Sequence, residues 1–135
     1  MQPIAINLLA LAACVVVRFI VGGLWFSPPL FLKAWQSETG VGNEAMKARM
    51  PMAMASDLIG SILMAFILAH AVRYAGASTP ATGAEVGALA WLGFIAVTTF
   101  ARVSYEGSSL RLFSISSGYN LVTLVLMGAI LGEWG

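Results

Sequence analysis

The sequence predicts an all-α integral membrane protein, and two observations carry that prediction. Four apolar stretches, at about 4–26, 52–74, 86–105 and 112–131, each reach the roughly 20 residues that a helix needs to cross a bilayer. Charged residues make up only 10% of the chain, and the mean hydropathy is +0.88. Such a composition leaves no polar shell for a soluble core. We therefore expect residues 1–135 to form a single transmembrane domain, a four-helix bundle.

The first stretch is expected to end at Pro28 and Pro29, because proline interrupts a helix. Residues 11–14, Leu-Ala-Ala-Cys, resemble the cleavage box of a lipoprotein signal. However, no Lys or Arg precedes the apolar run, and the run continues past Cys14. We therefore expect an uncleaved first membrane-spanning helix.

Residues 27–51 are the one substantial segment outside the apolar stretches. Within it, residues 30–35 are apolar and aromatic, which favours a position at the membrane interface. Glycines at 40 and 42 are expected to break this strip, and residues 43–47 to begin a capped helical turn that leads into the second span. The connection 75–83 is rich in Gly, Ser, Thr and Pro and is expected to be a tight surface linker.

The basic residues predict the orientation. Those that lie between the first and second stretches, or flank the turn between the third and fourth, are Lys33, Lys47, Arg49, Arg102 and Arg111. The connection between the second and third stretches has only Arg73. Since cytoplasmic loops carry an excess of Lys and Arg, we expect residues 27–51 in the cytoplasm and both termini outside.

An internal repeat is also predicted. Residues 57–70 of the second stretch align without a gap on residues 120–133 of the fourth, so that Asp57 falls on Asn120 and His70 on Glu133. Each half then contributes two spans and inserts in the same orientation. The bundle is accordingly expected to consist of two parallel two-helix repeats, related by a pseudo-two-fold axis along the membrane normal.

Polar residues inside apolar stretches are the candidate functional groups, because a charge near mid-bilayer costs at least about 2.5 kcal/mol. Arg18 and Asp57 have opposite charges at similar depth and are expected to form a buried ion pair. That pair could fix helix register only, or it could hold a substrate or a proton. Asn120 is expected to form a hydrogen bond between helices, and His70 to bond a carbonyl or water near the outer end of its helix. Arg102 and Glu106 are expected to pair at the cytoplasmic boundary.

Small residues mark the expected close contacts between helices. The candidates are Gly22, Gly23, Ala65, Ala69, Gly128 and Gly132. Packing within one chain is the simpler interpretation, and a face for a homo-oligomer is the alternative.

Composition also argues against several classes of function. A net charge of +1 gives no surface for nucleic acid. With one cysteine and one histidine, the chain has no evident set of metal ligands, and we expect no cofactor. Since no catalytic arrangement of side chains is recognisable either, the protein is not expected to be an enzyme.

Two segments resemble a known family. Residues 22–28, Gly-Gly-Leu-Trp-Phe-Ser-Pro, are followed by Leu-Phe at 30–31 and Lys-Ala-Trp at 33–35, and the second half has Tyr-Glu-Gly at 105–107 and Gly-Tyr at 118–119. This pattern is similar to a family of small four-span bacterial membrane proteins catalogued as domain of unknown function 1761. The chain departs from the family pattern at Pro29, at Leu32, where glycine is usual, and at Asn120, where histidine is frequent. The resemblance implies a four-span fold in the bacterial inner membrane, and it implies no activity.

Two functions fit these observations. The first is a small oligomeric channel or transporter for a small solute or ion, in which polar residues of the second and fourth spans line a cavity near the repeat axis. The second is a non-catalytic accessory or structural subunit of a larger membrane complex. The expected partners are the lipid bilayer and either further copies of the chain or other membrane proteins.

Overall fold

The computed structural model describes residues 5–134, and in these residues every regular element is a helix. In chain order they are α1 (Leu8–Trp25), α2 (Leu32–Thr39), α3 (Asn43–Tyr74), α4 (Pro80–Ala90), η1 (Trp91–Ala96), α5 (Val97–Glu106) and α6 (Leu110–Trp134). Because α4, η1 and α5 follow without a break, they form one continuous helix from Pro80 to Glu106. Its middle section, η1, is a π-helix.

Four of these helices are long and apolar enough to cross a membrane: α1, α3, the continuous α4–η1–α5 helix and α6. This agrees with the number of spans that the sequence predicts. α3 has 32 residues, or about 48 Å at 1.5 Å per residue, so it exceeds the thickness of a bilayer core. Its first residues include the predicted turn at 43–47, and the helix continues through Pro51 into the apolar part.

Helix boundaries differ from the predicted ones at the second span, where α3 begins at Asn43 and the predicted stretch at about 52, and at the third span. The sequence suggests a start near residue 86, whereas α4 begins at Pro80. The cause is a capping box, in which the Thr79 hydroxyl accepts the backbone N–H of Thr82 and the Thr82 hydroxyl accepts that of Thr79. Pro80 stands at the first helical position, where its missing N–H has no cost. The predicted linker 75–83 is therefore only as long as residues 75–79.

The remaining boundaries fall close to expectation. α1 ends at Trp25, just before the two prolines, and α2 ends at Thr39, where Gly40 caps it with a φ of 74° in the left-handed region. Residue 4, the predicted start of the first span, lies outside the described residues, and α1 begins at Leu8 behind an Asn7 cap. α6 begins two residues before, and ends three residues after, the predicted stretch.

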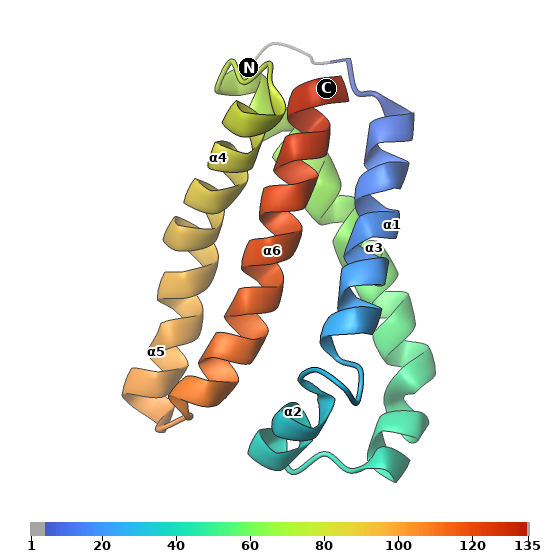
Figure 1. Cartoon of the computed structure of the whole chain (residues 1–135), viewed down its shortest axis with the longest axis vertical. Helices are drawn as coiled ribbons and strands as arrows, with labels where there is room; N and C mark the ends of the chain where they lie inside the picture. The colour runs from blue at the N-terminus through green and yellow to red at the C-terminus, as the bar shows by residue number, and fades with distance from the viewer. Residues whose placement is uncertain (1–4, 135) are drawn as a thin grey trace.

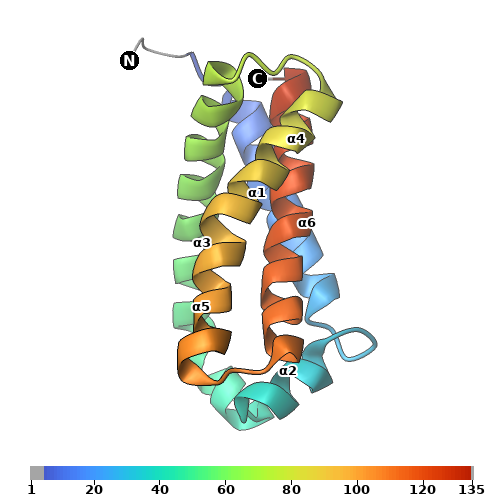
Figure 2. The same cartoon turned by 90° about the vertical axis from the view of Figure 1, so that its left-hand side faces the viewer.

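The helices are arranged around α6, which lies between α1 and the α4–α5 helix (Figure 1). In the view turned by 90°, α3 lies at the left and α6 at the right, with the α4–α5 helix in front of them and α2 below the lower end of α6 (Figure 2). Half of the most apolar stretch of α6 is buried, against 6% of that in the α4–η1–α5 helix. The core is formed by α1, α3 and α6, and its fully buried side chains include Ala10, Cys14, Ala65 and Met127.

The start of α1 and the end of α6 lie at one end of the bundle, with α2 and the α5–α6 turn at the other (Figure 1). The Asn7 amide donates to the carbonyl of Trp134 at 3.1 Å and ties these two helix ends together. At the opposite end, Glu38 of α2 accepts a hydrogen bond from Ser109 at 2.7 Å and pairs with Arg111 at 3.8 Å. The Ser109 hydroxyl also accepts the N–H of Leu112 at the start of α6. These contacts fix α2 against α6.

Helices α4 and α6 touch through four glycines, which we call the glycine seam: Gly83, Gly87, Gly128 and Gly132. A Cβ atom added at Gly83 would overlap the Gly128 carbonyl, and one at Gly87 would overlap the Leu124 carbonyl. The two backbones can approach this closely only without side chains. Gly128 and Gly132, predicted as packing residues, are therefore used inside the chain, with partners in α4.

Candidate functional site

The strongest candidate site is a polar cluster around Arg18, in the middle of an otherwise apolar interior. Arg18 projects from α1 and is 9% exposed. Its guanidinium reaches groups on α3 and α6. These are Ser61 Oγ at 3.0 Å from Nε, then Thr123 Oγ1 at 3.2 Å, Asn120 Oδ1 at 3.4 Å and Met64 Sδ at 3.5 Å from Nη1, and Asp57 Oδ1 at 3.7 Å from Nη2. We call these six residues, with Tyr119, the Arg18 cluster.

Helical spacing explains why the oxygen-bearing partners of Arg18 come in pairs, one pair from each of the neighbouring helices. Asp57 and Ser61 are four residues apart on α3, and Asn120 and Thr123 are three apart on α6. Residues at these intervals lie on one face of a helix. Each face is turned toward α1, so that one guanidinium meets both.

Tyr119 of α6 is the last member of the cluster and contacts Arg18 of α1. The Arg18 guanidinium carbon lies 4.9 Å from the centre of the Tyr119 ring, a cation–π arrangement. The Tyr119 hydroxyl donates to the backbone carbonyl of Arg18 at 3.1 Å. A Cβ at Gly22 would come within 3.1 Å of that hydroxyl oxygen, so Gly22 provides the space that the phenol occupies.

The two charges of the cluster have different surroundings. The Arg18 side chain is 11% exposed, whereas that of Asp57 is 39% exposed. Their separation of 3.7 Å is longer than the roughly 2.7–2.9 Å of a charge-assisted hydrogen bond. Arg18 is therefore surrounded mainly by neutral oxygen atoms, while Asp57 stands at the edge of the cluster with one side open. A cation fixed in the interior with its acid at the boundary can bind an anion in place of the carboxylate.

The structure brings together three of the predicted polar residues. The expected contact between Arg18 and Asp57 is present, and Asn120 makes the expected bond between helices by accepting from Arg18. His70 lies elsewhere. Its Nδ1 is 2.8 Å from the Phe66 carbonyl of its own helix, and its ring packs between Phe66 and Tyr74.

The remaining predicted residues lie outside the cluster. Arg102 and Glu106 pair at 3.5 Å near the α5–α6 turn, and both are mostly exposed. Ala65 and Ala69 are buried in the core of α1, α3 and α6. A Cβ at Gly23 would meet open space, so Gly23 makes no close helix contact within residues 5–134.

An apolar cavity of about 260 Å³ lies next to the cluster, between α3, α4, η1 and α6. Met64, which contacts Arg18, is one of its lining residues, together with Leu68, Phe94 and Leu124. Neither Asp57 nor Asn120 lines it. This apolar cavity is therefore not the polar cavity that the sequence predicts at Asp57 and Asn120.

Sequence analysis misses the neutral partners of Arg18, namely Ser61, Thr123 and Tyr119. Their spacing contains the missing signal, since Ser61 and Thr123 follow Asp57 and Asn120 by four and three residues on the same helical faces. It also misses Gly83, which lies in the segment that it assigns to a loop, and Gly87, which lies at the start of the predicted third stretch. Among residues 5–134, no three or more His, Cys, Asp or Glu side chains gather in a way that could hold a metal ion.

Comparison with known proteins gives a family and no activity. A family model described as a protein of unknown function (DUF1761) matches residues 9–132. No curated protein and no solved structure matches the chain significantly. The match includes the whole Arg18 cluster and all but the outermost residues of the four candidate spans, and the chain belongs to the DUF1761 family.

Proposed function

We propose that this protein is a multi-pass protein of the bacterial inner membrane that acts, as an oligomer, as a channel or transporter for a small solute or ion. Four helices of sufficient length and apolarity support the location. The absence of any predicted catalytic arrangement is the reason for assigning transport in place of an enzymatic reaction. No cofactor or metal is required by the proposal.

The observation that carries the transport assignment is the Arg18 cluster. Holding a charged group in hydrocarbon costs several kcal/mol unless other groups replace its hydration. Here, hydroxyl, amide and thioether groups replace most of the hydration of Arg18. The carboxylate of Asp57 therefore need not stay in place for Arg18 to remain stable. A partly exposed acid beside a stably buried cation is suited to yield its place to an anion.

The repeat and the oligomer belong to the same proposal. Asp57 and Asn120, the aligned residues of the two halves, both contact the Arg18 guanidinium, which supports a polar site between α3 and α6. Large apolar side chains on α3 and on the α4–η1–α5 helix are exposed in the single chain, for example Ile67 at 63% and Phe94 at 75%. Lipid or further copies of the chain are the proposed neighbours of these faces.

The alternative, an accessory subunit of a larger membrane complex, has one observation in its favour. Ser61 and Thr123 are fully buried around Arg18, so the interior side of the cluster is closed in the single chain. On this alternative the cluster only fixes the register of α1, α3 and α6. Its expected sign is co-purification with other membrane proteins at fixed stoichiometry.

Flux measurements in proteoliposomes test the transport proposal. The purified chain should move at least one class of solute among protons, small cations and small anions, and Asp57→Asn should reduce that flux while the protein still folds. Glu44→Gln is the matched control, because it removes an exposed acid from the same helix outside the cluster. Absence of flux for the wild-type chain, or equal flux in the wild type and Asp57→Asn, would overturn the proposed role of Asp57.

Orientation is a separate part of the proposal, with residues 27–51 in the cytoplasm and both termini outside. In a Cys14→Ala background, a cysteine placed at Asn43 should react with a membrane-impermeant reagent only after the cells are opened. Rapid labelling in intact cells would reverse the orientation.

A further inference from the structure

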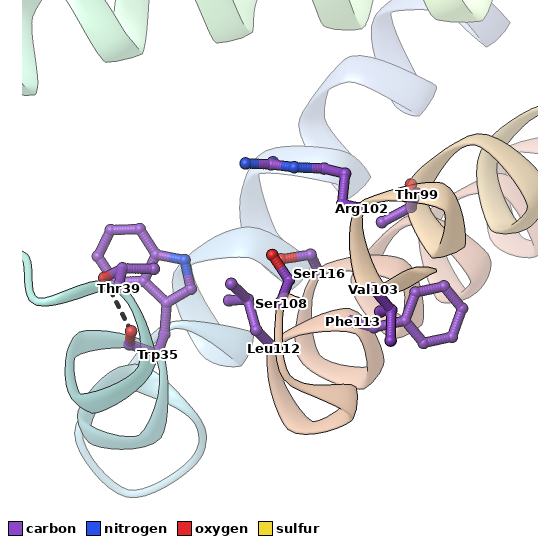
Figure 3. Close-up of a pocket in the computed structure, with 9 residues that line it drawn as sticks. All are labelled: Trp35, Thr39, Thr99, Arg102, Val103, Ser108, Leu112, Phe113 and Ser116. Atoms are coloured by element: carbon purple, nitrogen blue, oxygen red, sulfur yellow. Dashed lines mark hydrogen bonds between the residues drawn. The ribbon is translucent and has the colours of Figure 1, made fainter. Parts of the chain in front are cut away.

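A second cavity, of about 260 Å³, lies where α2, α5 and the start of α6 meet. Figure 3 shows Trp35 and Thr39 on the α2 side and Arg102, Thr99 and Val103 on the α5 side. The other lining residues are Ser108, Leu112, Phe113 and Ser116. This cavity is separate from the Arg18 cluster and shares no residue with it.

The polar lining of this cavity consists of one cation and several hydroxyls, with no acid. The hydroxyls of Thr99, Ser108 and Ser116 have no hydrogen-bond partner among residues 5–134. That of Thr39 already donates to the Trp35 carbonyl at 2.9 Å. A guanidinium with unused hydroxyl donors is the chemistry that recognises phosphate oxygen atoms.

Nearby acids do not cancel this preference. Glu38, the acid on α2, does not line the cavity, and its carboxylate is held by Ser109 and Arg111. Glu106 pairs with Arg102 at 3.5 Å, but the two side chains are 61% and 64% exposed. Exposed pairs of this kind are weak, so a better-placed anion can displace Glu106 from the guanidinium.

The apolar lining continues out of the cavity along α5. Val103, Leu112 and Phe113 form this wall, and the Phe113 ring meets that of Phe100 at 5.4 Å between centroids. Phe100 is 45% exposed, so the apolar surface passes from the cavity to the outside of the bundle. Trp35, with an apolar ring and a polar N–H, is typical of the boundary between hydrocarbon and headgroups.

From these features we propose that the cavity binds the phosphate of an anionic phospholipid headgroup, with Arg102 as the cation, while the acyl chains lie along the exposed face of α5. The cavity of about 260 Å³ accommodates a headgroup and not a whole lipid. The end of the bundle is also that of Lys33, Arg111 and the other basic residues predicted to be cytoplasmic, where anionic headgroups are found. The inference rests on the membrane location proposed above and not on transport.

Three probes distinguish the recognised group and its source. Native mass spectrometry of the full chain in a non-ionic detergent counts bound molecules during titration with dioctanoyl phosphatidylglycerol, dioctanoylglycerol and glycerol 3-phosphate. We expect saturable binding of one phosphatidylglycerol, at least tenfold weaker binding of the other two probes, and at least tenfold weaker phosphatidylglycerol binding in Arg102→Gln. Equal binding of dioctanoylglycerol would show that the phosphate is not recognised, and equal binding of glycerol 3-phosphate would show that a free phosphate is the ligand.

Two controls separate the cavity from general electrostatics. Arg49→Gln removes an exposed charge on the same predicted side of the membrane, outside the cavity, and should leave binding unchanged. The double variant Ser108→Ala, Ser116→Ala keeps the charge and should still weaken binding several-fold. Equal losses in Arg102→Gln and Arg49→Gln, or no loss in Arg102→Gln, would overturn the site. Flux in the wild type and in Asp57→Asn is measured separately. Lipid binding without flux would overturn only the transport proposal. Flux without lipid binding would overturn only the proposed lipid site.

Discussion

The two faces of α6 are packed in different ways. Toward α4, the contact is made by the glycine seam, where backbone meets backbone and no charged side chain takes part. Toward α1 and α3, the contact contains a buried guanidinium with partners on both neighbouring helices. In apolar surroundings, helices gain little from hydrophobic burial, and close packing and polar bonds remain as means of association. This chain uses one on each side of the same helix, so substitutions on the two sides should fail for different reasons.

The largest effect is expected in the glycine seam. Gly83→Leu forces a side chain into the backbone of Gly128, and because the obstacle is backbone, the helices must separate. We expect a loss of about 3 kcal/mol in the free energy of unfolding, measured by SDS titration in bicelles. Gly93→Leu is the control, because a Cβ at Gly93 meets open space. Similar stability of the two variants would show that α4 and α6 are not in close contact.

Removing the charge on the other face should cost somewhat less. Arg18→Met leaves the fully buried hydroxyls of Ser61 and Thr123 without their guanidinium partner and Asp57 without its counter-charge. We expect a loss of about 2 kcal/mol in the same measurement. Arg73→Met, on the exposed end of α3, should change stability by less than about 0.5 kcal/mol. If Arg18→Met were as stable as the wild type, the cluster would have no structural role, and its polar groups would require a purely functional explanation.

Two tryptophans allow a direct comparison of the faces. Trp25 of α1 donates to the Ile115 carbonyl at 2.9 Å, and Trp91 of η1 donates to the Ser117 carbonyl at 2.8 Å. Replacing either with Phe removes one hydrogen bond, and each should lower the free energy of unfolding by about 1 kcal/mol. Trp134→Phe, at a 57% exposed position, is the control. A much larger loss for one of the pair would show that the faces of α6 are unequal in stability.

The smallest effect is expected for the ion pair itself. In a double-mutant cycle of Arg18→Met and Asp57→Ala, the coupling should be about 0.5 kcal/mol, because the Asp57 side chain is 39% exposed and the pair is long. In a fully buried pair, removal of one partner would lower the free energy of unfolding by about 3 kcal/mol. Coupling of that size would mean that Asp57 is buried by lipid or by another copy of the chain.

The sequence predicts the parts of this molecule that depend on long apolar runs. The number of spans, the end of the first helix before Pro28 and the break at Gly40 follow from hydropathy and from proline and glycine. The early start of α4 does not, because polar residues at 79 and 82 resemble a loop until their hydroxyls are seen to cap a helix. Hydropathy measures composition, whereas a cap depends on geometry.

For the Arg18 cluster, the sequence predicts Arg18, Asp57 and Asn120 but not the residues that contribute hydroxyl groups. An arginine and an aspartate in apolar stretches are rare enough to suggest a pair. Serine, threonine and tyrosine are common in such helices, so nothing marks Ser61, Thr123 or Tyr119 until the helices are placed together. The proposed repeat aligns α3 with α6, but the alignment does not anticipate that half of the most apolar stretch of α6 is buried, against 22% of that of α3.

The π-helical section has a consequence for the rotational phase of the third span. Residues 83, 87 and 91 face α6 and recur every four positions. In an α-helix each residue turns about 100° around the axis, so four residues overshoot a full turn, and the line through these contact residues drifts by some 40° around the helix at each step. A π-turn contains more residues than an α-turn, so η1 turns the line back before α5 begins. Relaxing η1 into an α-helix would rotate Thr99 and Arg102 by about one residue's turn, roughly 100°, away from the cavity beside α2. The number of residues in this one helical turn thus determines whether the glycines at one end of the helix and Arg102 at the other can face α6 at the same time.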